Sequence, residues 1–313
     1  MKVLITGITG MVGSVFAKEY RARGNEVWGL ARNSASSRME ALDPQEVIRC
    51  DILERDALER IFDKCKPDVV IHMAAQAFNS ISWDCEYLTH NTNYIGTLNV
   101  LKCALKNGAA TKVLLACSSA EYGDFDPGEC PLKENRCLRP VTPYGVSKVG
   151  TELLGYQYYS NYGLPVYLPR MFIHIGAGHP PATAVQNFAR QLALIAAGKA
   201  EGPMRVGNLE AARDMIDVRD GVRAMMLLLE KGEPGQAVNI CAGRAYKMSE
   251  ILEILIHISG LDVEGIQDAA LLRASDELLL LGDNSKIKSY GFAARYSIEE
   301  TLEAVYRDWL ARV

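Results

Sequence analysis

The sequence lacks the features that mark several classes of protein. Its 313 residues carry a net charge of −4 and contain no run of Lys and Arg long enough to suggest a nucleic-acid surface. The longest apolar stretch near the C-terminus, residues 277–282, is far too short to span a membrane. Residues 1–10 already have the pattern of a strand and a turn, so no signal peptide is expected. We therefore predict neither nucleic acid nor membrane among the partners.

Paired cysteines are absent as well. The eight Cys are scattered, with no CxxC pair and no Cys/His cluster. This pattern predicts free thiols, a reducing cytoplasmic location and no metal site. Because the net charge is negative, an anionic ligand would need a local positive site, so individual Arg residues are more informative than the total charge.

The N-terminal half alternates short apolar runs with longer helical patterns. Such alternation predicts an α/β fold, a Rossmann-type doubly wound parallel sheet with helices on both faces. The predicted strands are Lys2–Thr6, Glu26–Leu30, Glu46–Arg49, Asp68–His72, Lys112–Cys117 and Pro165–Pro169. The predicted helices are Met11–Arg23, Asp56–Cys65, Cys85–Asn107 and Pro143–Tyr162.

The pattern changes after about Arg170. Segments rich in Gly and Pro, at 176–181, 202–207 and 232–235, separate the helices, and sequential β-α-β order is lost. We interpret residues 1–170 as a cofactor-binding domain and residues 171–313 as mainly a smaller C-terminal substrate-binding portion. Asp217–Leu229 and Ala237–Ile240, within residues 217–240, are predicted to return to the sheet.

Three glycines directly follow the first predicted strand. Gly7, Gly10 and Gly13 form Gly-x-x-Gly-x-x-Gly at the start of the first helix. Glycines there allow a tight turn, close approach of the backbone to a pyrophosphate and close helix–strand packing. The helix N-terminus, where Met11 lies, adds free N–H groups. A plain turn would use the same residue type, but the position between strand and helix favours dinucleotide binding.

The end of the second predicted strand distinguishes NAD from NADP. An NAD site places an acidic side chain there, and an NADP site places an Arg there for the phosphate. The strand ends in Ala31-Arg32 without a carboxylate. We predict NADP(H), with Arg32 on the phosphate; a solvated surface Arg is the alternative. Further cofactor contacts are predicted at Asp51, Ile52, Ala74 and Ala75.

Tyr144 and Lys148 are four residues apart and share one face of a predicted helix. A Lys ammonium favours the phenolate, so we expect the pKa of Tyr144 to fall from about 10 toward the working range. Tyr144 would then exchange a proton at a sugar carbon that undergoes hydride transfer. Ser118, at the end of the fifth predicted strand, can bond the substrate oxygen and the Tyr hydroxyl. We predict Ser118, Tyr144 and Lys148 as catalytic residues; a core Tyr with a surface Lys is the alternative.

Several motifs together resemble one enzyme family. They are the glycine motif, Ser118-Ser-x-x-Tyr-Gly123, Tyr144-Gly-Val-Ser-Lys148, Asn91-Thr-Asn93-x-x-Gly96-Thr97 and Gly207-Asn-Leu-Glu-Ala-Ala-Arg213-Asp214. Over nearly its whole length the chain resembles the extended short-chain dehydrogenase/reductases that modify nucleotide sugars, and among these the enzymes that handle GDP-mannose derivatives. The resemblance implies a GDP-linked sugar substrate, cofactor contacts from Asn93, Tyr144 and Lys148, and a homodimer formed through helices Cys85–Asn107 and Pro143–Tyr162.

The resemblance also implies the substrate contacts. They are Ser119, Glu121, His174, Asn187, Arg213 and Arg273. The chain departs from the family pattern near three of them. Ile173 stands where the family usually has Asn, His179 where Gln is common, and Ala274 where Pro usually follows Arg273.

One position separates the sister activities of the family. The dehydratases place a Glu two residues before Tyr122 as the base that removes the C5 proton, and this chain has Ala120 there. Glu121 is adjacent, but one step along a strand end tends to point a side chain the other way. We therefore predict NADPH-dependent reduction of the 4-keto group of a GDP-4-keto-6-deoxyhexose, giving GDP-D-rhamnose or a close epimer. A nucleotide-sugar 4-epimerase, a GDP-mannose 4,6-dehydratase and an inactive NADP-sensing protein are the alternatives.

Overall fold

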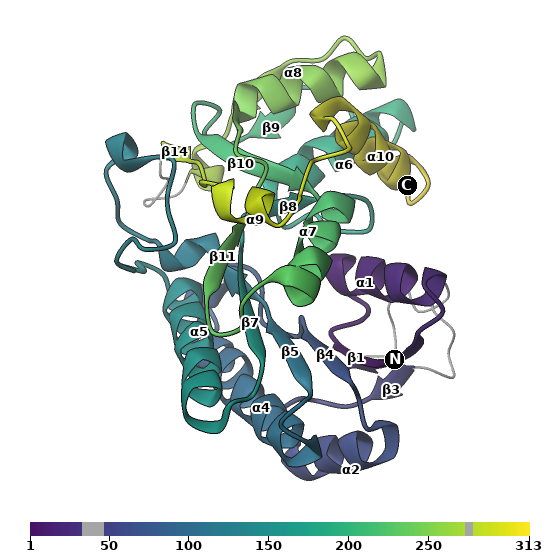
Figure 1. Cartoon of the computed structure of the whole chain (residues 1–313). Helices are drawn as coiled ribbons and strands as arrows, with labels where there is room; N and C mark the ends of the chain where they lie inside the picture. Colours follow the sequence, from purple (N-terminus) through teal and green to yellow (C-terminus); the bar gives the residue numbers. More distant parts are fainter. Residues whose placement is uncertain (33–46, 273–277) are drawn as a thin grey trace.

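The computed structural model describes residues 1–32, 47–272 and 278–313, and its lower half in Figure 1 is one parallel sheet. The strands of this sheet are β1 (Lys2–Thr6), β2 (Glu26–Ala31), β3 (Val47–Arg49), β4 (Val69–His72), β5 (Lys112–Leu115), β6 (Cys117–Ser118), β7 (Val166–Met171) and β11 (Ala237–Ile240). Their order is β11-β7-β5-β4-β1-β2-β3, with β6 paired to β7.

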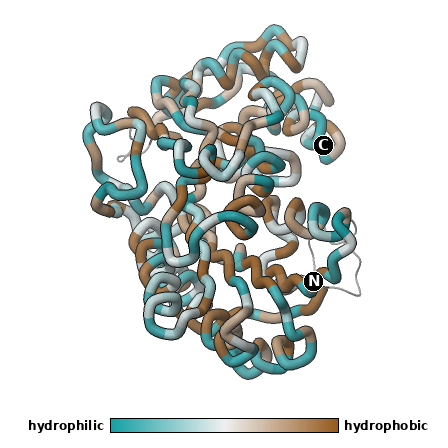
Figure 2. The backbone as a smooth tube through the Cα atoms, viewed as in Figure 1, coloured by the Kyte–Doolittle hydropathy of each residue, from teal (hydrophilic) through white to brown (hydrophobic). Residues whose placement is uncertain are grey.

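Helices cover both faces of this sheet. Val3 and Ile5 of β1 face α1 (Met11–Ala22) and α7 (Val218–Lys231), while Leu4 faces the opposite side. That side is covered by α2 (Arg55–Cys65), α4 (Gly96–Asn107) and α5 (Pro143–Tyr162). Strands buried on both faces are continuously apolar, and they appear brown in Figure 2. The predicted Rossmann-type α/β fold is confirmed.

Two predicted elements are interrupted. The predicted strand Lys112–Cys117 breaks at Ala116, so that β6 is separate and leads into a short 3₁₀ turn, Ser119–Glu121. The predicted helix Cys85–Asn107 consists of α3 (Glu86–His90), a π-helical segment (Asn91–Ile95) and α4. A single wide turn inside a helix leaves no clear mark on sequence periodicity. Of the described helices, none has the length and apolar character needed to cross a membrane.

The chain beyond β7 builds a second, smaller portion. Its core lies among α6 (Ala184–Ala196), α8 (Met248–Ser259) and α10 (Ile298–Leu310), drawn at the top of Figure 1. The strands here are β8 (Ile173–Ile175), β9 (Met204–Val206), β10 (Ala212–Asp217), β12 (Ala245–Lys247), β13 (Gly265–Gln267) and β14 (Leu279–Leu280). β10 pairs with β8, β12 and β14, and β9 pairs with β13. The chain returns to the main sheet through α7 and β11, after which α9 (Ser285–Ser289) contacts β11.

Candidate active site

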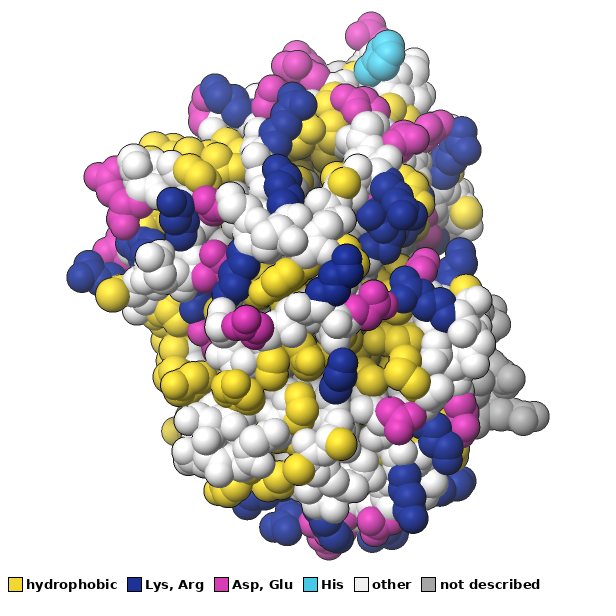
Figure 3. All heavy atoms as spheres, in the orientation of Figure 1, with side chains coloured by type: hydrophobic (Ala, Val, Ile, Leu, Met, Phe, Trp, Pro, Cys, Tyr) yellow, Lys and Arg dark blue, Asp and Glu magenta, His cyan; other side chains and the backbone are white. Residues whose placement is uncertain are grey.

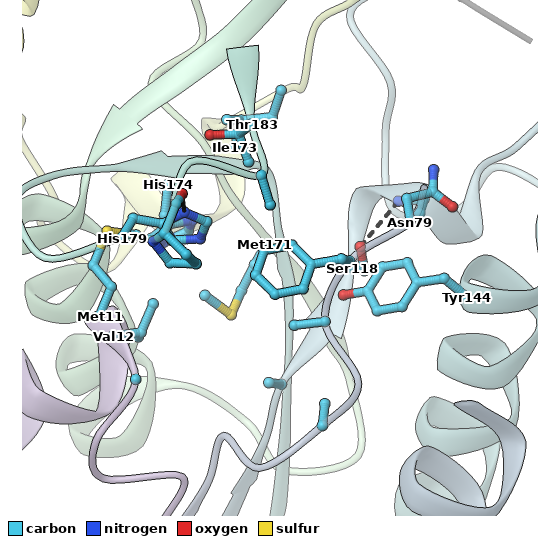
Figure 4. A pocket seen from close by; sticks show the side chains of 18 of the residues that line it. Met11, Val12, Asn79, Ser118, Tyr144, Met171, Ile173, His174, His179 and Thr183 are labelled. Carbon is cyan, nitrogen blue, oxygen red and sulfur yellow. Dashed lines mark hydrogen bonds between the residues drawn. The ribbon is translucent and has the colours of Figure 1, made fainter. Parts of the chain in front are cut away.

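A cavity of about 1170 Å³ lies where the strand order of the main sheet reverses, beside β1 and β4. Its wall combines the carboxyl ends of the sheet strands with β8, α6 and β10 of the second portion. Open parallel sheets bind their ligands at such a reversal. In Figure 4, Met11 borders the cavity at one end and Ser118 and Tyr144 border it at the other.

The glycine turn after β1 leaves no room for side chains. Gly7 has a φ of 69°, a left-handed conformation that favours glycine. A Cβ on Gly13 would lie 2.3 Å from the carbonyl oxygen of Gly7, and a Cβ on Gly7 would lie 2.8 Å from the amide nitrogen of Ala74. Gly7, Gly10, Met11 and Gly13 all line the cavity at the start of α1. This cradle fits a dinucleotide pyrophosphate.

The other predicted cofactor contacts continue from this turn along the cavity. Arg32 lies exposed at the end of β2, immediately before residues 33–46, which are outside the described part of the chain. Asp51, Ile52, Ala74 and Ala75 line the same cavity from the ends of β3 and β4. These positions and the glycine turn all line the same cavity.

The start of α5 is fixed by its capping residues. The Thr142 hydroxyl accepts a hydrogen bond from the Gly145 amide at 3.0 Å, and Pro143 takes the first helical position. Tyr144 therefore lies in the first turn, and Lys148 lies one turn later on the same side.

The three predicted catalytic residues come together in the cavity. The Ser118 and Tyr144 side chains lie next to each other and both point into the cavity in Figure 4. The Lys148 Nζ lies 5.8 Å from the centroid of the Tyr144 ring and donates a hydrogen bond to the Ala116 carbonyl at 2.7 Å. This is the arrangement of an acid–base pair next to a cofactor cradle.

Burial controls the protonation of Tyr144. It raises the pKa of Tyr144 to about 12, and the hydrogen bond with Ser118 offsets only part of the rise. Burial also lowers the pKa of Lys148, whose ammonium is directed to the Ala116 carbonyl. The expectation that Lys148 brings the pKa of Tyr144 below its usual value is therefore wrong in this structure. Tyr144 keeps its proton at neutral pH and can donate it.

Asn93 does not lie at the cofactor, and that prediction is wrong. The Asn93 side chain is buried. Its Oδ1 accepts a hydrogen bond from the Gln76 amide at 2.8 Å, and its Nδ2 donates one to the Gln76 carbonyl at 3.0 Å. The same Nδ2 donates to the Ser147 hydroxyl at 2.9 Å. Asn93 thus joins the loop after β4, which carries Ala75, to the helix that carries Lys148.

The predicted substrate contacts divide into three groups. Those that line the cavity are Ser119, His174, Asn187 and Arg213. Arg273 lies outside the described residues. Glu121 is completely buried in the core and is not part of the cavity wall. The predicted contact between Glu121 and the substrate is therefore wrong.

His174 is a neutral group in the cavity wall. Its Nδ1 lies 2.8 Å from the Phe172 carbonyl, and burial lowers its pKa to about 4. Arg213 reaches the cavity from β10, with one guanidinium nitrogen donating to the Ala212 carbonyl at 3.0 Å. Arg213 therefore brings a cation to the cavity from the second portion, next to neutral polar groups.

Comparisons with known proteins agree with this geometry. The sequence model of a family described as GDP-mannose 4,6 dehydratase matches residues 4–305. This chain belongs to that family. A Pseudomonas aeruginosa protein named GDP-6-deoxy-D-mannose reductase is 30% identical to this chain and covers 100% of it, with 98% of the relative aligned.

Two solved structures extend the comparison to the fold of this family member. The structure of RMD from Pseudomonas aeruginosa complexed with NADPH matches with a TM-score of 0.88 at 29% identity, covering 100% of this chain and 99% of that one. The UDP-glucose 4-epimerase of Thermotoga maritima with UDP-glucose matches with a TM-score of 0.91 at 28% identity, with the same coverage. The recognition of an extended short-chain dehydrogenase/reductase is confirmed.

Within this dehydratase-family chain, Ala120 and Glu121 lie on opposite sides of the turn after β6. Ala120 lines the cavity, whereas the Glu121 carboxylate accepts a hydrogen bond from the Ser118 amide at 2.7 Å inside the core. The expectation that neighbouring side chains point to opposite sides at this strand end holds. No carboxylate from this turn reaches the cavity.

Other cavity residues of this family member were not foreseen. Met171 lies across the middle of the cavity in Figure 4. The Phe78 and His179 rings meet edge to face at 5.7 Å, joining a loop of the sheet portion to a loop of the second portion. Arg312, two residues after α10, also lines the cavity. Only the unusual His179 carried a signal in the sequence, because the other positions depend on how the two portions pack.

Proposed function

We propose that the protein is an oxidoreductase that uses NADPH to reduce the 4-keto group of a GDP-4-keto-6-deoxyhexose, giving GDP-D-rhamnose or a close epimer. The observation that carries the proposal is that Tyr144 lies next to Ser118 in the cavity wall, where burial raises the pKa of Tyr144 to about 12. Ala120 occupies the position at which a dehydratase would hold its base. The relative named GDP-6-deoxy-D-mannose reductase supports the same activity.

The residues of the cavity fit NADPH. The glycine turn provides the pyrophosphate cradle, and Arg32 provides a cation for the ribose phosphate. When bound, NADPH supplies a hydride for C4 of the sugar. The Ser118 hydroxyl holds the C4 oxygen, and Tyr144 donates its proton to that oxygen, so that the ketone becomes a hydroxyl. The Lys148 ammonium is held next to the Tyr144 ring by its hydrogen bond to the Ala116 carbonyl.

The nucleotide part of the substrate is a guanosine diphosphate, which the second portion binds. A buried diphosphate requires paired cations or N–H donors, and Arg213 lines the cavity at the end facing this portion. Asn187 of α6 adds an amide to the same wall. Calorimetry with GDP, UDP and dTDP is expected to show the tightest binding for GDP, and weaker GDP binding by Arg213→Ala. Tighter binding of UDP or dTDP would discard the GDP-sugar and leave the reductase chemistry standing.

A nucleotide-sugar 4-epimerase is the second candidate. The fold match to the Thermotoga maritima UDP-glucose 4-epimerase favours it. An epimerase keeps its cofactor bound and returns the hydride to the other face of the sugar, so it consumes no NADPH. A reductase oxidises one NADPH for each sugar reduced. Spectrophotometry of NADPH with the GDP-4-keto-6-deoxyhexose is expected to show this one-to-one loss, and formation of a 4-epimer without NADPH loss would contradict it.

The protein assembles as a homodimer through α3, the π-helical segment and α5. These elements expose a band of large apolar side chains, including Tyr87, Tyr94, Leu153 and Tyr156. In Figure 3 apolar side chains gather at the lower left, where Figure 1 places α5. A contiguous apolar patch of this kind marks an interaction surface. The cytoplasmic location stays a prediction from the cysteine pattern.

A further inference from the structure

A buried cluster of ionisable groups lies behind the catalytic strand end. Glu121, Glu152 and Cys117 bring their carboxyl oxygens and sulfur within 4.8 Å of one another, and all three are buried. Arg170 of β7 enters the same cluster and is also buried. None of these side chains has a role in the mechanism above, although the cluster adjoins Ser118.

The charges in this cluster do not balance if both carboxyls are ionised. Arg170 binds both oxygens of Glu152, with Nε–Oε2 at 2.8 Å and Nη2–Oε1 at 2.7 Å. Its Nε is 3.6 Å from Glu121 Oε2, and its Nη1 donates to the Tyr122 hydroxyl at 3.2 Å and the Glu134 carbonyl at 2.9 Å. The guanidinium therefore pairs most closely with Glu152, and Glu121 shares the same cation at a longer distance.

The unpaired oxygen of Glu121 identifies where a proton belongs. Glu121 Oε2 is buried and finds no donor among the described residues, while the Glu152 carboxyl lies in the same cluster. Two carboxyls can share a hydrogen bond only if one of them carries a proton. An unpaired buried carboxylate costs several kcal/mol, so such a group takes up a proton instead. Burial and the neighbouring Glu152 accordingly raise the pKa of Glu121 well above its usual value.

The other oxygen of Glu121 fixes the catalytic turn. Glu121 Oε1 accepts a hydrogen bond from the Ser118 amide at 2.7 Å, while the Ser118 hydroxyl accepts one from the Ala120 amide at 3.2 Å. These two bonds close the 3₁₀ turn after β6 and hold Ser118 toward Tyr144. The same turn packs on α5, because a Cβ on Gly145 would lie 2.6 Å from the Ala120 carbonyl.

We propose that Glu121 is a positioning residue of the reductase site that works in its neutral, proton-bearing form, accepting from the Ser118 amide with one oxygen and donating to Glu152 with the other. The proposal rests on the reductase function above. Loss of the Glu121 proton would leave a second negative charge behind Ser118 and Tyr144 and would break the link to Glu152. The ionisable groups that face Glu121 from the packed elements are Cys117, Tyr144, Lys148, Glu152 and Arg170.

Two substitutions of Glu121 distinguish the effect of its hydrogen bond to Ser118 from the effect of its charge. Glu121→Gln keeps an acceptor for the Ser118 amide and mimics a neutral carboxyl, so kcat near neutral pH is expected to stay within about twofold of wild type. Glu121→Leu leaves the buried Ser118 amide without a partner, so kcat is expected to fall by about tenfold or more while the Kd for NADPH is unchanged. Glu253→Gln, an exposed carboxyl on α8, is the control and should behave as wild type.

Two further readouts report on the proton itself. The alkaline decline of kcat is expected to move to higher pH in Glu121→Gln, because Gln cannot ionise. The infrared difference spectrum of wild type minus Glu121→Gln at neutral pH should contain the C=O stretch of a protonated carboxyl. The proposal would be overturned by a carboxylate band in this difference spectrum or by identical pH profiles of kcat in wild type and Glu121→Gln. Equal losses of kcat in Glu121→Gln and Glu121→Leu would overturn it as well. If wild type reduces no 4-keto sugar, the proposed function fails, but the infrared band still decides the state of Glu121.

Discussion

The protonation of Tyr144 depends on the residues that surround it. Burial raises its pKa to about 12, and its partner Ser118 is a neutral hydroxyl. The Lys148 ammonium, on the same helix, donates its hydrogen bond to the Ala116 carbonyl. A phenol that holds its proton suits the reductive direction, in which the acid must be protonated when the sugar arrives.

Removing the Tyr144 hydroxyl tests this assignment. Tyr144→Phe keeps the ring that lines the cavity, so NADPH binding is expected to stay near wild type while kcat falls by about 10²–10⁴. Fluorescence titration of NADPH and steady-state rates measure the two effects separately. Turnover close to wild type in this variant would place the acid on another residue.

Arg32 is expected to set the preference for NADPH over NADH. A charge-assisted contact to a phosphate contributes about 1.5–3 kcal/mol, so Arg32→Ala should weaken NADPH by about ten- to a hundredfold. The affinity for NADH should not change, because NADH lacks this phosphate. Arg49→Ala, at the end of the neighbouring strand and outside the cavity wall, is the control. Equal losses of affinity for NADPH and NADH in Arg32→Ala would show that Arg32 does not bind the phosphate.

The sequence revealed the residues whose role depends on spacing alone. The glycine turn and the Tyr144–Lys148 pair are local patterns, and both are found in the cavity wall. Asn93 and Glu121 were misplaced because their direction depends on irregular turns. Asn93 lies in the π-helical segment and Glu121 in a 3₁₀ turn, and in both places a small change of winding redirects the side chain.

Helix α5 contributes both to the cavity and to an exposed apolar surface. One side of the helix carries Tyr144 and Lys148 into the cavity, while Val146, Leu153 and Tyr156 are exposed on its outer surface. Gly150 allows the Tyr94 ring of the π-helical segment to approach, since a Cβ there would lie 2.8 Å from Tyr94 Cδ2. The exposed residues of both elements thus form one surface.

A charge on this surface is expected to separate the dimer. Leu153 is 57% exposed, and burying one such side chain contributes about 1.5–3 kcal/mol per copy. Leu153→Asp would place an unpaired carboxylate in the interface, so light scattering should show monomers. Ile266→Asp, on β13 of the second portion, is the matched control and should leave the mass unchanged. A dimer that persists in Leu153→Asp would move the interface elsewhere.

At the scale of the whole molecule, the cavity exists because two portions of the chain meet over the reversal of the sheet. The sequence could predict that the positions proposed for the cofactor lie together, because they follow the ends of consecutive strands in a parallel sheet. The residues that close the cavity from the second portion, such as Arg312, could not be predicted, because their positions depend on packing between segments far apart in sequence. The contact between Phe78 and His179 is of the same kind.

In the proposed reaction, hydride passes from NADPH to C4 of the sugar and Tyr144 supplies the proton. The most direct test is a single reaction of the pure protein with the GDP-4-keto-6-deoxyhexose and NADPH carrying deuterium at the transferred position, followed by NMR of the sugar product. One deuterium at C4 is expected for each NADPH oxidised. A reduced or epimerised product without deuterium at C4, or conversion of GDP-mannose to its 4-keto-6-deoxy form by the protein alone, would contradict it.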